Sequence, residues 1–191
     1  MTEDLIHIDK TFEKLAFFNQ TLSNREFDGC IFRNCDFSGS NLSNNIFSDC
    51  EFYDCNLGMS KLRGTGLKTV AFTNCKLLGV RFDEADDFLF NVSFDNSTLD
   101  FASFENRKMP KTVFINCSLR ETIFIGADLS GSDFDHCTLE HAIFNETNLA
   151  SCDFTTAHHF NIDPEFNPMK KAKFSADGIL GLLQKYDIKI V

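Results

Sequence analysis

Eight cysteines are the side chains of this sequence with the widest chemistry, because cysteines can form disulfides or bind a metal ion. Their spacing argues against both roles. Each cysteine lies two residues before a phenylalanine or leucine, in a position that elsewhere holds small residues such as Ser60, Val70 and Ala102. We therefore expect free thiols that serve as small buried packing side chains. These cysteines are Cys30, Cys35, Cys50, Cys55, Cys75, Cys117, Cys137 and Cys152.

The five histidines give no sign of a metal or catalytic site. His136 and His141 are five residues apart, which places them on different sides of the repeat described below. His158 and His159 have no cysteine or carboxylate at metal-ligand spacing. The sequence also has no nucleophile motif and no phosphate-binding loop. We expect no catalytic residue, no metal, no cofactor and no enzymatic activity.

Acidic residues are the remaining candidates for a functional surface. The net charge is -10, and residues 158–191 contain five lysines and four acids, so residues 1–157 carry -11. The stretches 82–106 and 121–157 contain no Lys or Arg and seven acids each. Such a negative surface attracts a basic partner and repels nucleic acid. The second stretch supplies the candidate partner-binding residues Glu121, Asp128, Asp133, Asp135, Glu140, Glu146 and Asp153.

The elements that position these residues repeat every five residues. From Cys30 to Leu57 each fifth residue is Phe or Leu, and the whole chain has 23 Phe but no Trp. This period matches neither an α-helix nor a flat strand. A fixed short repeat is typical of a solenoid. We therefore predict an all-β structure that turns a corner every five residues, with the large residues filling its axis.

The repeat predicts a rod with two irregularities. Four five-residue faces per coil give about seven coils and a length of roughly 34 Å at strand spacing. The series breaks after Phe82 and resumes at Leu89, which predicts a two-residue bulge within 83–88. Around Arg107–Pro110 the pattern is strained, because Arg107 occupies a small-residue position. Residues 1–29 follow the period weakly and are expected to form a degenerate capping coil.

The repeats are expected to end near residue 157, and 158–191 forms a different C-terminal part. After an irregular segment, Ser175 is a potential N-cap, a short helix follows, and IKIV suggests a terminal strand. The last coil of a solenoid exposes its core and an open edge, which must be covered. This part either caps its own coil or pairs with a second copy, and we favour pairing.

Several segments resemble the pentapeptide-repeat family. They are CDFSG (35–39), SNLSN (40–44), ADLSG (127–131), SDFDH (132–136) and TNLAS (147–151). The resemblance covers roughly residues 10–156 and implies a right-handed quadrilateral β-helix. Residues 34–54 and the ending GILGLLQKYDIKIV (178–191) also resemble the Qnr-type quinolone-resistance proteins. Those proteins often carry long projecting loops, whereas the interruptions here are the short slip near Asp86–Asp87 and the strained Arg107–Pro110.

The Qnr resemblance implies a homodimer that mimics duplex DNA and binds DNA gyrase or topoisomerase IV, with quinolone protection as a consequence. The alternative is a scaffold of the same family with another protein partner and no mimicry. Neither hypothesis involves direct nucleic-acid binding or a membrane. The N-terminus lacks a signal-peptide pattern, so we expect a cytoplasmic protein. The dimer contacts implied are Phe174, Ile179, Leu182, Leu183, Tyr186, Ile188 and Ile190.

Overall fold

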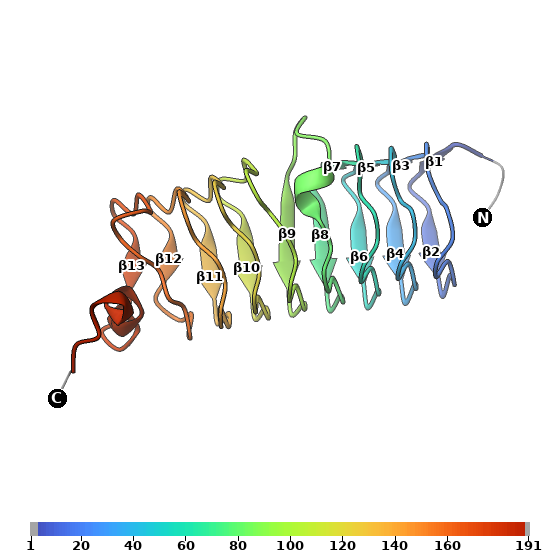
Figure 1. Ribbon diagram of the computed structural model, residues 1–191. Coiled ribbons are helices and arrows are strands. Elements are labelled where there is room, and N and C mark those ends of the chain that lie inside the picture. Colours follow the sequence, from blue (N-terminus) through green and yellow to red (C-terminus); the bar gives the residue numbers. More distant parts are fainter. Residues whose placement is uncertain (1–3, 190–191) are drawn as a thin grey trace.

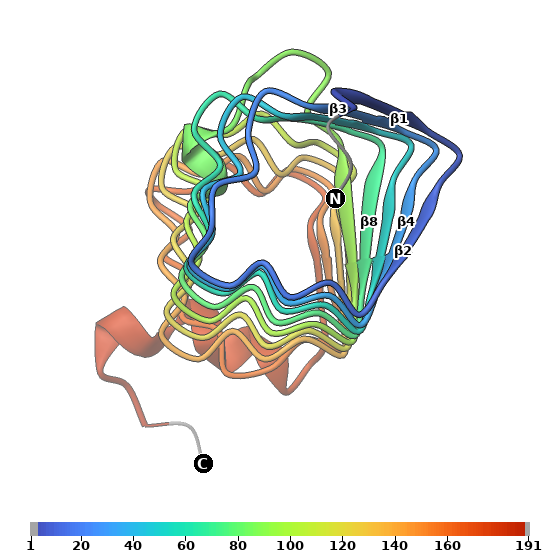
Figure 2. The same cartoon turned by 90° about the vertical axis from the view of Figure 1, so that its right-hand side faces the viewer.

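The computed structural model describes residues 4–189 and shows a β-solenoid, with the two ends of the chain at opposite ends of the rod (Figure 1). Seen along its axis, each coil has four sides (Figure 2). All strand pairs are parallel. The all-β solenoid expected from the repeat is therefore confirmed.

Two sides of the coil are built from short strands. One side forms a four-stranded sheet of β1 (Ile6–Ile8), β3 (Glu26–Asp28), β5 (Ile46–Ser48) and β7 (Gly66–Lys68). The adjacent side forms a nine-stranded sheet of β2 (Thr11–Glu13), β4 (Ile31–Arg33), β6 (Glu51–Tyr53), β8 (Val70–Thr73), β9 (Val92–Asp95), β10 (Val113–Ile115), β11 (Asp133–Asp135), β12 (Asp153–Phe154) and β13 (Lys173–Phe174). Isolated parallel bridges such as Asp36↔Asn56 and Ser103↔Ile123 continue the pairing on the other two sides.

The large residue of each five-residue repeat points into the axis, where the aromatic rings of successive coils stack. The Phe32 and Phe52 rings are 4.6 Å apart and nearly parallel, and Phe32 also meets Phe47 of the adjacent side edge to face. Such offset and perpendicular contacts are the preferred geometries of aromatic pairs. Phenylalanine recurs because it fills the axis without bringing a polar group that would need a partner.

All eight cysteines are buried and free, as the spacing predicted. Their thiols donate weak hydrogen bonds to backbone carbonyls, for example from Cys55 Sγ to the Phe32 carbonyl at 3.5 Å. Burial raises the pKa of Cys50 to about 12. The thiols therefore act as small interior side chains.

Most corners place one residue in the left-handed region, and most of these residues are Asn, Asp or Gly. Asn34 has φ 54° and Gly39 has φ 63° at successive corners. Asn and Gly are among the residues that enter this region at lowest cost. The corners therefore set the length of each side to five residues.

The strands of successive coils pair in a constant register, as in Phe32↔Phe52, except at one point. Val70 pairs with Val92, two positions beyond the partner that the regular register would give it, and this confirms the two-residue bulge. A 3-10 helix, η1 (Phe82–Glu84), begins the bulge. The prediction that Leu89 resumes the core series is wrong, because Leu89 is 63% exposed and Phe90 is buried in its place.

The strand ladder is longer at both ends than the sequence analysis expected. His7, on β1, is fully buried and stacks on Phe27 at 4.9 Å, so the inward series begins before Phe12. At the other end Phe154 pairs with Phe174, one full coil beyond the expected end of the repeats near residue 157. The nine-stranded sheet thus spans about eight coils instead of about seven.

The C-terminal segment consists of two 3-10 helices, η2 (Gly178–Leu182) and η3 (Gln184–Tyr186), instead of the expected amphipathic helix. The Ser175 hydroxyl accepts a hydrogen bond from the Gly178 N–H, which is the capping role expected of it. Ile188 and Lys189 form no strand, and the remainder of the expected terminal strand, Ile190–Val191, lies outside the described residues. Within residues 4–189 no helix has the length and apolar character needed to cross a bilayer.

Candidate protein-interaction surface

The C-terminal half of the nine-stranded sheet carries the most coherent acidic surface. Asp95, Ile115 and Asp135 occupy one outward column on β9, β10 and β11, and Asp133 pairs with Asp153 in the other column. Adjacent strands lie about 4.8 Å apart, so these carboxylates follow the axis of the rod. Carboxylates grouped on a rigid sheet can bind a basic groove of a partner protein.

Neighbouring groups shift the pKa values of Asp133 and Asp153 in opposite directions. Burial, followed by the charges of Asp153 and Asp135, raises the pKa of Asp133. Hydrogen bonds from Lys173 and Thr155 lower the pKa of Asp153 to about 2. The Lys173 Nζ lies 2.8 Å from Asp153 Oδ2 and partly neutralises the column at β13. The negative surface is therefore strongest between β9 and β12.

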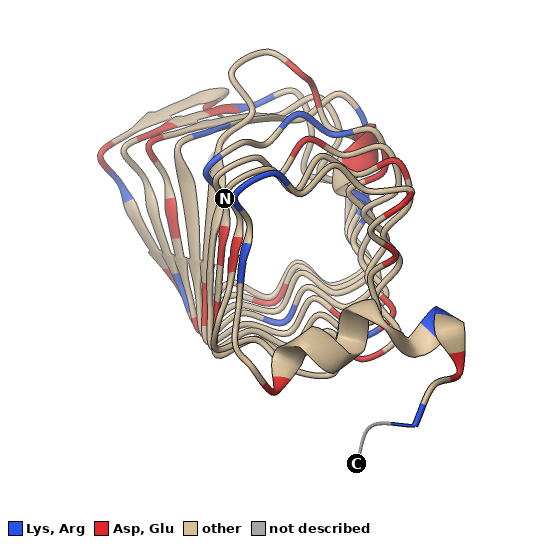
Figure 3. Ribbon diagram, turned by 90° about the vertical axis from the view of Figure 1, so that its left-hand side faces the viewer, with Lys and Arg blue, Asp and Glu red and all other residues tan. Residues whose placement is uncertain are grey.

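The structure does not bring all seven candidate acids together. Asp133, Asp135 and Asp153 share the nine-stranded sheet, whereas the other four lie on other sides or corners of the coil. Asp and Glu residues occur on several sides of the rod (Figure 3). Glu140 pairs with Arg120 at 3.3 Å. Asp128 accepts a hydrogen bond from Asn148. Glu121 and Glu146 are exposed corner residues with positive φ.

Asp95 also belongs to this surface, although it is not among the seven candidates predicted from the sequence. The signal was present in the sequence, since residues at equivalent positions of successive coils must align and Asp95 lies two coils before Asp135. The alignment of Asp95 with Asp135 is hard to see in the sequence, because the two residues are far apart along the chain and successive five-residue segments lie on different sides of the coil.

The bulge and Arg107 form a single structural unit. The Arg107 side chain is 2% exposed and extends under the bulge, where its guanidinium donates to the Phe82 and Ala85 carbonyls. It also pairs with Asp87 at 2.5 Å and lies 4.6 Å from the centre of the Phe90 ring. The arginine in a small-residue position therefore fills the space that the two extra residues create. The bulge projects from the rod between β8 and β9 (Figures 1 and 2).

The expected dimer residues separate into two groups. Phe174 and Leu182 pack against the core of their own coil. Ile179, Tyr186 and Ile188 are between 48% and 56% exposed. Leu183 is half-buried, and Ile190 lies outside the described residues. The segment therefore caps its own coil with one side and leaves an apolar side open.

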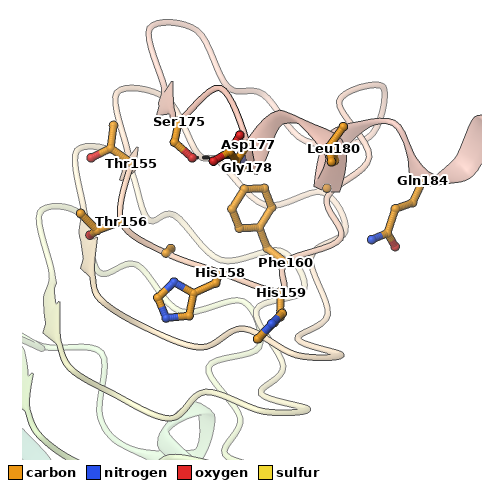
Figure 4. Close-up of a pocket in the computed structure, with 12 residues that line it drawn as sticks. Thr155, Thr156, His158, His159, Phe160, Ser175, Asp177, Gly178, Leu180 and Gln184 are labelled. Atoms are coloured by element: carbon orange, nitrogen blue, oxygen red, sulfur yellow. Dashed lines mark hydrogen bonds between the residues drawn. The ribbon is translucent and has the colours of Figure 1, made fainter. Parts of the chain in front are cut away.

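A hollow of 340 Å³ lies between the last coil and the C-terminal segment (Figure 4). The Phe160 ring points toward Gly178, and a Cβ atom on Gly181 would collide with the Phe160 carbonyl oxygen. His158 and His159 line the opposite side and are exposed. Among the described residues no three His, Cys, Asp or Glu side chains are grouped so that they could hold a metal ion.

The fold and surface define a repeat-built parallel β-solenoid whose outward positions are available for protein contacts. Residues 25–104 match the family described as "Pentapeptide repeat region", and residues 97–135 and 132–158 match "Pentapeptide repeats (8 copies)". The chain belongs to the pentapeptide-repeat family. No curated protein matches it.

The fold is similar to solved structures of QnrB1, described as a plasmid-mediated fluoroquinolone resistance protein. One trypsin-treated variant superposes with a TM-score of 0.71 at 20% identity, covering 98% of this chain and 99% of the other. A second trypsin-treated variant gives 0.61 at 21% identity, covering 95% and 100%. Full-length QnrB1 gives 0.51 at 22% identity, covering 93% and 100%. These similarities concern the fold.

Proposed function

We propose that the protein is a non-enzymatic acidic rod that mimics duplex DNA and binds a type II topoisomerase, DNA gyrase or topoisomerase IV. The observation that carries the proposal is the group of four carboxylates on the nine-stranded sheet: Asp95 on β9, Asp133 and Asp135 on β11, and Asp153 on β12. Duplex DNA offers one negative charge per ~1.7 Å of axis. Residues 1–157 carry -11 over roughly 34 Å, seven strand spacings from β2 to β12, which is about half that density. The QnrB1-like fold supports the same partner class and, with it, protection from quinolones in the cytoplasm.

Gyrase supercoiling in the presence of ciprofloxacin tests the proposal. Increasing amounts of the protein should restore supercoiling. A variant that neutralises the sheet, Asp133→Asn with Asp135→Asn and Asp153→Asn, should lose most of this effect. The matched control removes the same charge from other sides of the rod through Glu121→Gln, Asp128→Asn and Glu146→Gln, and it should retain the effect. No rescue by the native protein, or equal loss in both variants, would contradict the proposed surface.

A scaffold with a different protein partner is the second candidate. The observation that favours it is the spread of Glu121, Asp128, Glu140 and Glu146 over other sides of the rod, since a DNA mimic needs its charge on one surface. Salt separates the two functions. A charged mimic loses partner affinity steeply as ionic strength rises and competes with DNA, whereas an apolar scaffold contact does neither.

A further inference from the structure

One corner of the rod carries apolar side chains that the fold does not require. Because the inward residues already fill the axis, the fold does not require apolar side chains at the outward positions, and these positions are usually polar. At this corner successive coils place Met59, Gly79, Phe101, Glu121 and His141, aligned by backbone hydrogen bonds between coils. Met59 is 64% exposed and Phe101 is 54% exposed. Exposed apolar residues that gather on one surface commonly mark an interaction site.

Phe101 is also unfavourably placed for its type. Its φ is 61°, in the left-handed region, where most corners of this chain have Asn, Asp or Gly. A bulky residue in this region is an outlier that costs free energy. Strain of this kind is retained where a residue has a task beyond the fold.

The adjacent outward column continues the apolar surface. Ser103, Ile123 and Ile143 align through parallel bridges on the side that follows this corner. Ile123 is half-buried and Ile143 is 44% exposed. Ile123 and Ile143, together with Phe101, Glu121 and His141, line an open hollow of 530 Å³. Two isoleucines in successive coils of one outward column give this side a shallow apolar groove.

Carboxylates surround the groove. Asp100 and Glu140 immediately precede the corner residues Phe101 and His141, and Glu121 itself lines the hollow. Glu105 lies two residues beyond Ser103 on the same outward side. Two cations near the groove are paired: Arg120 pairs with Glu140, and Arg81 of the preceding coil pairs with Asp83. The rim is therefore negative around an apolar floor.

From this combination we infer that the Phe101–Ile123–Ile143 groove is a docking surface for a basic amphipathic segment of a partner protein. An apolar side of such a segment covers the groove, and its lysines or arginines face Glu121 and Glu105. Helices that lie in apolar grooves bind through similarly spaced apolar anchors. The groove lies on a different side of the coil from the nine-stranded sheet, so the inference does not depend on topoisomerase binding.

Methyl NMR with a defined peptide tests the inference. The probe is a helical peptide of roughly 15 residues with leucines on one side and lysines on the other. It should shift the Ile123 and Ile143 methyl signals of the full chain. Ile123→Thr with Ile143→Thr should weaken the affinity about thirtyfold, since each isoleucine contributes on the order of 1 kcal/mol and the two together about 2 kcal/mol. Val113→Thr, an exposed apolar residue on the nine-stranded sheet, is the matched control and should leave affinity unchanged.

Phe101→Asn separates binding from folding. Asparagine suits the left-handed corner, so this variant should raise the Tm by about 2 °C while it weakens peptide binding. A peptide with the same composition in scrambled order should bind poorly. Equal binding of the scrambled peptide, shifts at other isoleucines only, or self-association of the chain through this groove would overturn the inference.

Discussion

His7 is the buried residue whose charge is coupled to folding. It stacks on Phe27 and contacts Phe12, and its Nε2 atom has no hydrogen-bond partner among residues 4–189. Burial, together with the charges of Lys10 and Arg25, lowers its pKa. Below the unfolded value near 6.5 the unfolded chain binds a proton that the folded chain resists. The stability of the first coil is therefore complete above about pH 6.5 and is lost as the pH falls toward the folded pKa.

His7→Phe should remove this pH dependence, because phenylalanine occupies the same inward column at Phe27 and Phe47. Hydrogen exchange of the β1 amides at pH 5.0 and pH 7.5 measures the effect. The native chain should lose protection at the lower pH, and the variant should not. His141→Asn, at an exposed corner, is the control and should behave like the native chain. An unchanged pH response in His7→Phe would show that another group is responsible.

The thiols provide a second prediction for single residues. Burial raises the pKa of Cys50 and Cys152 to about 12, so native thiols should react slowly with a maleimide or disulfide reagent at pH 8. Because a solenoid opens from its ends, Cys30 and Cys152 should be modified before the central Cys75. Mass spectrometry of partly labelled protein gives the order. Rapid modification of all eight thiols in the folded protein would contradict the burial.

At the scale of elements, Arg107 determines the shape of the bulge that begins at η1. Arg107→Ala should leave the Ala85 carbonyl without its donor, leave the Phe82 carbonyl with the Ala85 N–H alone, and open a void under Phe90. Leaving a buried backbone acceptor without its donor costs roughly 1–3 kcal/mol. Chymotrypsin should then cut beside the exposed Phe88 and Leu89 much faster, while the distant coils stay folded. Lys108→Ala removes an adjacent exposed cation and should leave cleavage unchanged. Equal cleavage in both variants would show that Arg107 does not hold the bulge.

The sequence predicted the ladder well because each side of the coil repeats the same chemistry. The sequence pattern could not show whether Leu89 or Phe90 is the inward residue, since both are apolar and either would fit after a short bulge. The Phe90 ring contacts Arg107, which belongs to the next coil, and a local sequence pattern cannot reveal such a contact. The acidic candidates failed to cluster for a related reason. Consecutive residues of the chain are distributed over all four sides of the coil, whereas the surface of one side is built from residues one whole coil apart.

The repeat pattern also failed to predict the last coil, at the C-terminal end of the rod. Asn167, Met169, Ala172 and Phe174 occupy inward positions one coil after Thr147, Leu149, Cys152 and Phe154. The intervening Pro164 and Pro168 hide the period, but their segment still pairs through the Leu149 N–H and the Pro168 carbonyl. Backbone hydrogen bonds between coils therefore extend the rod by one coil, through a segment in which the five-residue period of the side chains is no longer evident.

At the scale of the whole molecule, the C-terminal segment closes one end of the rod. Gly178 and Gly181 let the chain pack closely on Phe160, and Lys185 pairs with Asp163 and Glu165 to hold η3 against the last coil. This closure leaves Ile179, Tyr186 and Ile188 facing outward. An outward apolar side at the end of a rod is well placed for a second copy, which would join two rods into one longer negative rod.

We predict a homodimer through this end. Light scattering of the native chain should give twice the monomer mass of 21.7 kDa. Ile179→Lys with Ile188→Lys should give monomers with an unchanged Tm, because neither side chain packs against its own core. Leu78→Lys, at another exposed apolar position, should remain dimeric. A native chain that stays monomeric at high concentration would refute the dimer and leave the segment as a cap for its own coil.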